Sequence, residues 1–178
     1  HGPLRACVAN AGVGGPNFPK KDDRFVELVT TNLIGTYHTL RGAQTHLAPG
    51  PEPRHLVAFS SILGRIGVPH YTAYCASKAG ILGLTRALAT EVAGEGIQVN
   101  AICPGWVATE MAWEGIDGMA KAMKITRDEA LAGAMKDVPL GRMSEPEDVA
   151  GLVAYLLSAD ARGITGQALD MNNGAFMI

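Results

Sequence analysis

Short apolar runs alternate with longer segments of helical periodicity along this chain. Each run is four to six residues long and ends near Gly, Pro, Asn or Ser, which is typical of buried strands. The strands that this pattern predicts cover residues 4–9, 55–59, 97–102 and 167–171. The helices that it predicts cover residues 23–46, 73–93 and 146–157, with mixed helix and loop over 106–138.

Two of the predicted helices carry further local signals. In the first, Phe25, Leu28, Val29 and Asn32 recur at steps of three and four residues after an acidic start, so Asn32 lies on the apolar stripe. In the last, Pro146 stands at the first turn, where proline costs little. We therefore expect Asn32 to be buried, and a buried amide needs hydrogen-bond partners.

The order of these elements predicts the fold class. Strands that alternate with helices need crossover connections, and these give a parallel sheet covered by helices on both faces. Neither a repeat nor an interdomain linker interrupts the 178 residues. We expect one doubly wound α/β domain over residues 1–178.

The composition of the chain limits the classes of binding partner that we expect. Hydrophobic residues make up 47% of the chain, and the net charge is −2, so no basic surface indicates nucleic acid. The apolar runs are far shorter than the roughly 20 residues that span a bilayer. Cys7, Cys75 and Cys103 are widely spaced and lie in apolar segments, which favours buried reduced thiols over a disulfide or a metal site. We expect a cytoplasmic protein without a nucleic-acid, membrane or metal partner.

Tyr74 and Lys78 are four residues apart on a predicted helix, so both project from one face. A free tyrosine has a pKa near ~10, and an ammonium group one turn away favours the phenolate. Such a pair can act as an acid/base group, although an isolated match is usually a solvated surface pair.

Ser61 makes this pair more informative. It lies 13 residues before Tyr74, at the carboxyl end of a predicted strand, where open α/β sheets bind their ligands. A hydroxyl there can hold a carbonyl oxygen beside the tyrosine, whereas taken alone Ser61 is typical of a turn at a strand end.

With these residues in place, the chain resembles the short-chain dehydrogenase/reductase family. The resemblance extends over nearly the whole chain, and its motifs keep the family's order. They are Asn10-Ala11-Gly12, Asn32-Leu33-Ile34-Gly35, Ser60-Ser61-Ile62-Leu63-Gly64, Tyr74-Cys75-Ala76-Ser77-Lys78-Ala79, Val99-Asn100 with Pro104-Gly105-Trp106-Val107 and Thr109, and Gly166-Gln167 to Gly174. The fold that this implies is a Rossmann-type doubly wound sheet.

The resemblance implies a catalytic role for four residues. Tyr74 would exchange a proton with the alkoxide, and Ser61 would orient the carbonyl oxygen. Lys78 would lower the pKa of Tyr74 and bind the nicotinamide ribose. Asn32 would hold, through its backbone, a water that links Lys78 to solvent. The alternative for Asn32 is an internal hydrogen-bonding residue with no catalytic part.

The resemblance also implies NAD or NADP as the cofactor, with NADP favoured by analogy. The residues expected to contact it are Asn10, Ala11, Gly12, Tyr74, Lys78, Pro104, Gly105, Val107 and Thr109. Without the neighbouring motifs, the first three are typical of an ordinary loop and the last four of an ordinary strand-to-helix connection.

One family feature is not found in these residues. The family's Gly-rich turn, which seats the cofactor pyrophosphate at a helix amino terminus, has no counterpart, because Gly12-Val13-Gly14-Gly15 leads into Pro16. We expect about 80 further residues upstream, with the first strands and helices of the sheet. The alternatives are a non-catalytic fragment that keeps the fold for binding or signalling, and a related lyase or epimerase, which the complete Ser-Tyr-Lys set disfavours.

Residues 109–139 are rich in Met and Trp, which suits either an adaptable wall around an apolar substrate or packing on the protein's own core or on another subunit. Residues 127–150 resemble bacterial 3-oxoacyl carrier-protein reductases and polyketide ketoreductases, which implies a small ketone, alcohol or acyl thioester as substrate. Gly80, Gly83 and Ala87 would let helices of two subunits approach, and the family resemblance implies a homodimer or homotetramer.

Overall fold

The computed structural model describes residues 2–177. Four strands form one parallel sheet, as the alternating pattern predicted, and their order is β1-β2-β3-β4. The strands are β1 (Ala6–Ala9), β2 (Arg54–Phe59), β3 (Ile97–Pro104) and β4 (Ala168–Met171). Because all four run the same way, their carboxyl ends meet at one edge of the sheet, which is where ligands of open α/β sheets bind.

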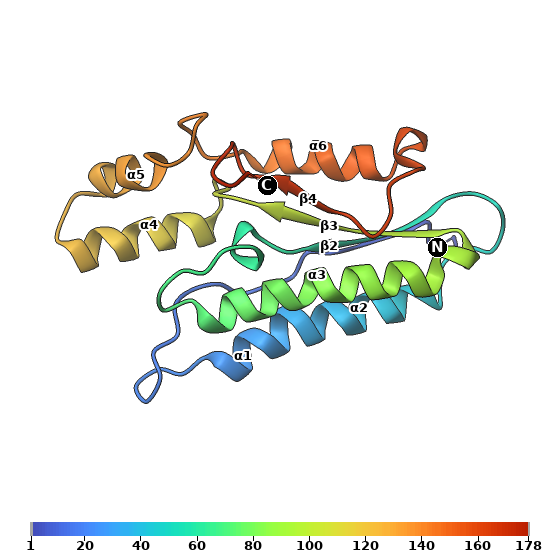
Figure 1. Ribbon diagram of the computed structural model, residues 1–178, viewed down its shortest axis with the longest axis horizontal. Coiled ribbons are helices and arrows are strands. Elements are labelled where there is room, and N and C mark those ends of the chain that lie inside the picture. The colour runs from blue at the N-terminus through green and yellow to red at the C-terminus, as the bar shows by residue number, and fades with distance from the viewer. Residues whose placement is uncertain (1, 178) are drawn as a thin grey trace.

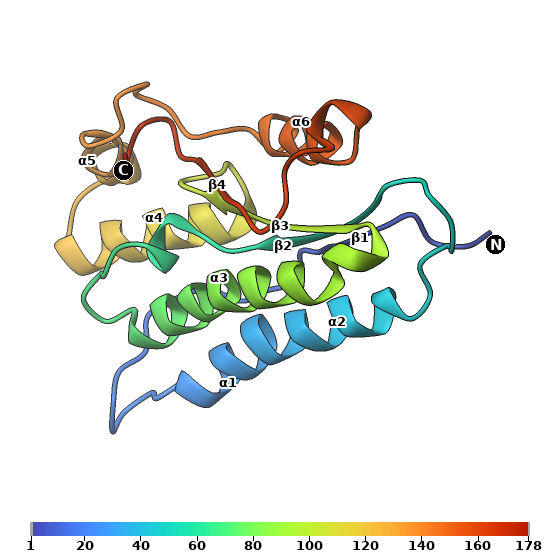
Figure 2. The ribbon, with the colours of Figure 1, turned by 45° about the vertical axis from the view of Figure 1, so that its right-hand side comes forward.

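Helices cover both faces of this sheet (Figures 1 and 2). One face carries α1 (Phe25–Val29), the π-helical turn η1 (Thr30–Ile34), α2 (Gly35–Gln44) and α3 (Thr72–Val92). The opposite face carries α6 (Pro146–Leu156), whereas α4 (Glu110–Met123) and α5 (Arg127–Met135) lie beyond the carboxyl ends of the strands. Short 3-10 turns are η2 (Ile62–Gly64), η3 (Ala93–Glu95) and η4 (Ala159–Ala161). The doubly wound α/β fold is therefore confirmed.

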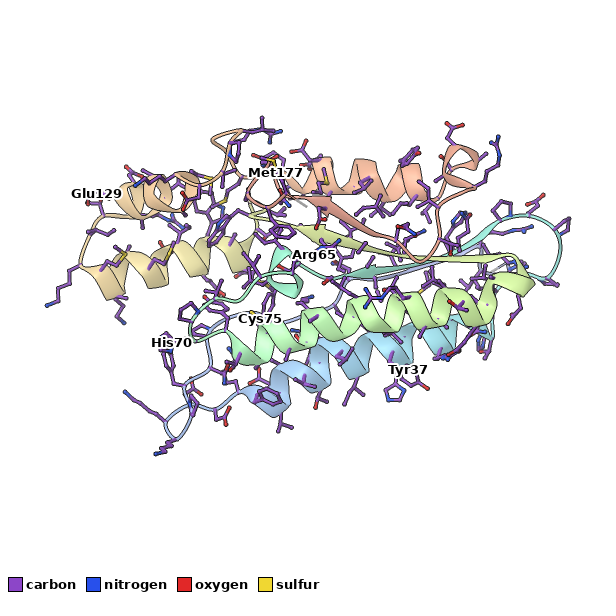
Figure 3. The ribbon with its side chains drawn as sticks, viewed as in Figure 1. Tyr37, Arg65, His70, Cys75, Glu129 and Met177 are labelled. Carbon is purple, nitrogen blue, oxygen red and sulfur yellow. The ribbon has the colours of Figure 1, made fainter. Side chains whose placement is uncertain are left out.

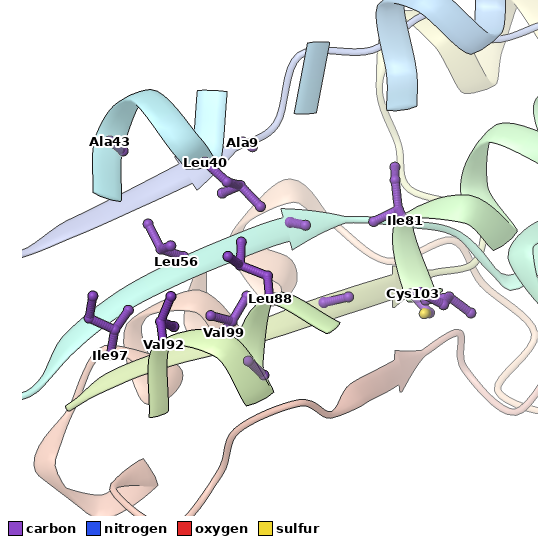
Figure 4. Close-up of a cluster of buried hydrophobic side chains, with 14 residues drawn as sticks. Ala9, Leu40, Ala43, Leu56, Ile81, Leu88, Val92, Ile97, Val99 and Cys103 are labelled. Carbon is purple, nitrogen blue, oxygen red and sulfur yellow. The ribbon is translucent and has the colours of Figure 1, made fainter. Parts of the chain in front are cut away.

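The main apolar core fills the space between the sheet and the pair α2 and α3 (Figure 4). Leu40 of α2, Leu56 of β2 and Leu88 of α3 are buried there almost completely. A second cluster forms under α6, where Leu156 packs with Ile102. Burial of each such side chain stabilises the fold by about 1.5–3 kcal/mol, so the two cores hold both helical layers against the strands.

The first helix differs from its expected form. The segment predicted as one helix over 23–46 is helical from residue 25 to residue 44, but a π turn interrupts it at 30–34. Asn32 lies in that turn and is fully buried, as expected. A π turn inside an α-helix frequently accompanies a functional site.

Gly80 has a different partner from the one expected. A Cβ placed on Gly80 would lie 2.6 Å from Cδ2 of Leu33, so this glycine lets η1 approach α3 within one chain. The close approach that we assigned to a subunit contact is, at Gly80, an internal one. Gly83 and Ala87 are exposed on the outer side of α3.

No helix among residues 2–177 is both long enough and apolar enough to span a membrane.

Candidate active site

The fold brings Tyr74 and Lys78 to the start of α3, next to the carboxyl end of β2. Lys78 is only 6% exposed, and its Nζ lies 5.5 Å from the centroid of the Tyr74 ring. The two side chains therefore share one face of the helix, as their spacing predicted.

Lys78 is held by two hydrogen bonds to the end of β2. Its Nζ donates to the carbonyl of Phe59 at 2.9 Å, and the Ser60 hydroxyl donates to the Lys78 carbonyl at 2.8 Å. Burial lowers the pKa of Lys78 to about 8, because the charged ammonium is largely withdrawn from water. A lysine with a lowered pKa and a fixed position is able to exchange protons near neutral pH.

This lowered pKa predicts how stability depends on pH. The folded chain loses the Lys78 proton near pH 8, whereas the unfolded chain keeps it up to about 10.5. Burial of the charge therefore destabilises the fold below pH 8, and this penalty fades as the pH rises towards 10.5. From about pH 7 to about pH 9.5, the unfolding free energy of the wild type should rise by about 2 kcal/mol relative to Lys78→Met.

Denaturant unfolding of both proteins across this pH range measures the difference. Lys136→Met serves as the matched control, because it removes the same side chain from an exposed position. Parallel curves for the wild type and Lys78→Met would contradict the expected penalty.

Ser61 completes the group around Tyr74. It is 8% exposed and directly precedes η2, where its hydroxyl accepts a hydrogen bond from the Leu63 amide at 3.2 Å. Burial raises the pKa of Tyr74, and a hydrogen bond with Ser61 acts in the opposite direction. The lowering of the Tyr74 pKa by Lys78 remains a prediction.

The Asn32 side chain joins the loop after β1 to α3. Its Oδ1 accepts from the Val13 amide at 2.8 Å, while its Nδ2 donates to the Val13 carbonyl at 2.9 Å and to the Ser77 hydroxyl at 3.2 Å. Its backbone carbonyl accepts from the Thr36 hydroxyl at 2.6 Å. All three side-chain bonds are internal, as the non-catalytic interpretation expects. The backbone relay remains a prediction.

Gly12 lies where the loop after β1 passes the site. A Cβ at this position would stand 3.1 Å from Oδ1 of Asn32 and 3.6 Å from Nζ of Lys78. The absence of a side chain thus leaves the backbone of the loop directly beside both residues. Asn10 and Ala11, which precede Gly12, are exposed at the same edge of the sheet.

The loop that follows β3 also reaches this edge. A Cβ on Gly105 would lie 2.9 Å from Cβ of Asn172, so this glycine lets the ends of β3 and β4 approach closely. The Thr109 amide donates to the Val107 carbonyl at 2.7 Å, and Thr109 directly precedes α4. Pro104, Gly105, Val107 and Thr109 therefore lie together at the carboxyl end of β3.

The segment rich in Met and Trp packs mainly on itself. Its side chains form a separate apolar cluster between α4 and α5, centred on Ile116 and including Trp113. Met111 and Met123 are 44% and 65% exposed. A Cβ on Gly14 would lie 2.8 Å from Sδ of Met111, so α4 touches the loop after β1 through this methionine. Of the two interpretations, internal packing accounts for most of the segment.

Gly64 and an ion pair also shape the site, and sequence reasoning assigned neither of them a role. A Cβ on Gly64 would lie 2.7 Å from Oγ of Ser60 and 3.0 Å from the backbone of Lys78, so η2 rests directly on α3. Arg65, labelled in Figure 3, follows η2. It pairs with Asp170 at 3.0 Å, which joins the Ser61 segment to β4. The sequence motif around Ser61 includes Gly64. This glycine was the residue from which the sequence could have indicated the contact between η2 and α3.

Known proteins resemble this chain over nearly its whole length. A family model described as Enoyl-(Acyl carrier protein) reductase matches residues 1–175. The 3-oxoacyl-[acyl-carrier-protein] reductase FabG of Haemophilus influenzae is 35% identical over 178 residues, which cover 99% of this chain and 69% of that protein. A putative ketoacyl reductase of Streptomyces coelicolor is 37% identical over 179 residues, covering 98% and 68%.

Solved structures agree with the fold. A variant of actinorhodin polyketide ketoreductase with NADPH superposes with a TM-score of 0.88 at 33% identity, covering 98% of this chain and 68% of that one. A short chain dehydrogenase family protein from Francisella tularensis gives a TM-score of 0.88 at 28% identity, covering 96% and 70%.

Proposed function

Because the chain belongs to the short-chain dehydrogenase/reductase family, we propose that it is the catalytic portion of a nicotinamide-dependent oxidoreductase. The reaction interconverts a ketone and a secondary alcohol. The observation that supports this proposal best is the gathering of Ser61, Tyr74 and Lys78 at the carboxyl end of β2. A hydroxyl that can hold an oxygen, a phenol and a buried lysine suit proton transfer to a forming alkoxide.

Each of these residues has a distinct part in the proposed mechanism. Ser61 donates a hydrogen bond to the carbonyl oxygen of the substrate and fixes its position. Tyr74 gives its proton to that oxygen as the alkoxide forms. Lys78 restores the proton of Tyr74 and stabilises the phenolate. The Asn32 carbonyl holds a water that connects Lys78 to solvent, using the lone pair that Thr36 leaves free.

The residues present fit the nicotinamide half of the cofactor. Gly12 has no side chain where it passes Asn32 and Lys78, so its backbone can face a flat ligand. We propose that Asn10, Ala11 and Gly12 contact the cofactor on one side, and that Tyr74 and Lys78 bind the ribose hydroxyls. Pro104, Gly105, Val107 and Thr109 would hold the nicotinamide carboxamide. When bound, the cofactor supplies the hydride.

The proposed substrate is a ketone carried on an acyl thioester. The support comes from the relatives, since two of them are named as a 3-oxoacyl-[acyl-carrier-protein] reductase and a putative ketoacyl reductase. NADP is the favoured cofactor, because the actinorhodin polyketide ketoreductase structure is described with NADPH.

A coenzyme-oxidation assay tests the proposal. The full protein is mixed with NADPH or NADH and a short 3-oxoacyl thioester, and loss of the reduced nicotinamide is followed together with formation of the 3-hydroxyacyl product. We expect turnover that depends on both coenzyme and thioester. Coenzyme binding without turnover on any ketone or alcohol, or no coenzyme binding at all, would favour the non-catalytic alternative.

We propose further that the protein is cytoplasmic and assembles as a homodimer or homotetramer. Ile34 of η1, Tyr37 of α2, and Gly83 and Ala87 of α3 are exposed. Tyr37 points away from the rest of the fold (Figure 3). Exposed small and large apolar residues on these helices suit the packing of helices from two subunits.

A further inference from the structure

Asn17 is a buried polar residue in the loop between β1 and α1. Its neighbours Phe18, Pro19 and Lys20 are exposed, yet Asn17 itself is only 3% exposed. A buried amide that makes no use of its donors and acceptors is costly. The partners of its side chain therefore indicate what this position does.

The Asn17 side chain caps the amino terminus of α3. Its Oδ1 accepts from the Thr72 hydroxyl at 2.9 Å and from the Ala73 amide at 3.1 Å, and these are the first two residues of the helix. The residue in the usual capping position, Tyr71, makes no side-chain capping bond. The first amides of a helix lack partners within it, and a side-chain oxygen normally supplies one. Here that oxygen comes from a residue 56 positions before Ala73.

The same loop is fastened to the segment that precedes α3. The backbone amide of Asn17 donates to the backbone carbonyl of His70 at 2.8 Å, and the ring centroids of Phe18 and His70 lie 5.1 Å apart. His70 has a left-handed backbone with φ of 67°, so this hydrogen bond fixes a turn that a non-glycine residue adopts only at a cost.

Asn17 also links α3 to the beginning of α1. Its Nδ2 donates to Oδ1 of Asp23 at 3.3 Å, and the same oxygen accepts from the Phe25 amide at 3.1 Å. One amide–carboxylate pair thus joins the starts of the helix that leads to Asn32 and the helix that carries Tyr74.

We propose that Asn17 is a positioning residue that holds Tyr74 in place by capping α3 from a distant loop. This inference rests on the proposed function of Tyr74. Tyr74 directly follows Ala73, the residue that Asn17 binds, so it lies in the turn that the cap fixes. Lys78 lies one turn later and has its own bonds to Phe59 and Ser60. Loss of the cap should therefore displace Tyr74 and leave Lys78 in place.

The test compares Asn17→Ala with the wild-type full protein in three measurements. Hydrogen exchange of the Ala73 amide should become about fivefold faster, as loss of a helix cap predicts. Modification of Tyr74 by tetranitromethane, followed by peptide mass spectrometry, should also accelerate. Turnover should fall about tenfold through misplacement of the reacting groups.

Variants that exchange the side chains of Asn17 and Asp23 provide the matched control. Asn17→Asp alone puts two carboxylates in contact with each other and should impair Tyr74. Asn17→Asp with Asp23→Asn keeps an oxygen facing Thr72 and Ala73 and restores an amide–carboxylate pair, so it should recover wild-type behaviour in every measurement. If Asn17→Ala does not fold, the same three measurements on the single and double exchange variants test the proposal.

Two outcomes would overturn the proposal. Unchanged exchange at Ala73 would show that Asn17 does not cap α3. Faster exchange with unchanged Tyr74 modification would show that the cap does not position Tyr74. Hydrogen exchange and Tyr74 modification can both be measured in a protein that shows no turnover. These outcomes are therefore distinct from failure of the proposed function, which only the coenzyme assay reports.

Discussion

Tyr74→Phe should abolish nearly all turnover and leave the protein folded. The ring of Tyr74 packs against Tyr71, with centroids 6.4 Å apart, and phenylalanine keeps that contact. The hydroxyl is the proton donor of the proposed reaction, and a positioned acid/base group contributes about 10² to 10⁴-fold to rate. The turnover number with saturating coenzyme and thioester measures this loss.

Tyr155→Phe is the matched control, since it removes the same atom elsewhere. Tyr155 is 44% exposed on α6, which covers the face of the sheet opposite α3 (Figure 1). We expect this variant to keep wild-type turnover. A Tyr74→Phe protein that retained more than half of the activity would disprove the assignment of Tyr74.

Asn32→Ala should lower the free energy of unfolding by about 3 kcal/mol. The truncation leaves the amide and carbonyl of Val13 without their partner, whereas the Ser77 hydroxyl loses one bond and keeps its bond to the Tyr74 carbonyl. Each buried polar group left unsatisfied costs about 1–3 kcal/mol, and part of that cost is recovered where the loop after β1 can reach water. Denaturant unfolding with a common slope for both proteins measures the change.

Asn10→Ala is the control for this second experiment. Asn10 is exposed in the same loop, and its truncation should alter stability by less than about 0.5 kcal/mol. Because alanine keeps the backbone carbonyl to which the proton relay is assigned, the loss of stability in Asn32→Ala reports the role of the side chain alone. An Asn32→Ala protein as stable as the wild type would contradict the bridging role of the side chain.

Local patterns in the sequence were sufficient to predict the strands and most helices. The start of α6 followed from Pro146, and α3 agreed with its expected limits within a residue at each end. The grouping of Ser61 with Tyr74 and Lys78 was also accessible, because the first lies at a strand end and the others one turn apart on a helix. These features depend on neighbours in sequence or on the common edge of parallel strands.

The features that the sequence did not reveal depend on contacts between distant segments. Ser77 meets Asn32 across 45 residues, and the cap of α3 comes from Asn17. The partner of Gly80 proved to be Leu33 because the space around a glycine is set by tertiary packing. Burial, which dominates the pKa of Tyr74, likewise follows from the assembled fold rather than from the spacing of Tyr74 and Lys78.

The π turn has a consequence for the angular phase of the helix around it. Leu28, Asn32, Thr36 and Leu40 are all at most 4% exposed, yet they follow one another at steps of four. In a regular α-helix, twelve residues rotate about 120° beyond three full turns, which would carry Leu40 away from the sheet. The wider turn at residues 30–34 takes up that rotation. Deleting any one residue there would return the helix to regular geometry with eleven steps between Leu28 and Leu40, about 20° beyond three full turns, so the apolar sides of α1 and α2 would stay aligned.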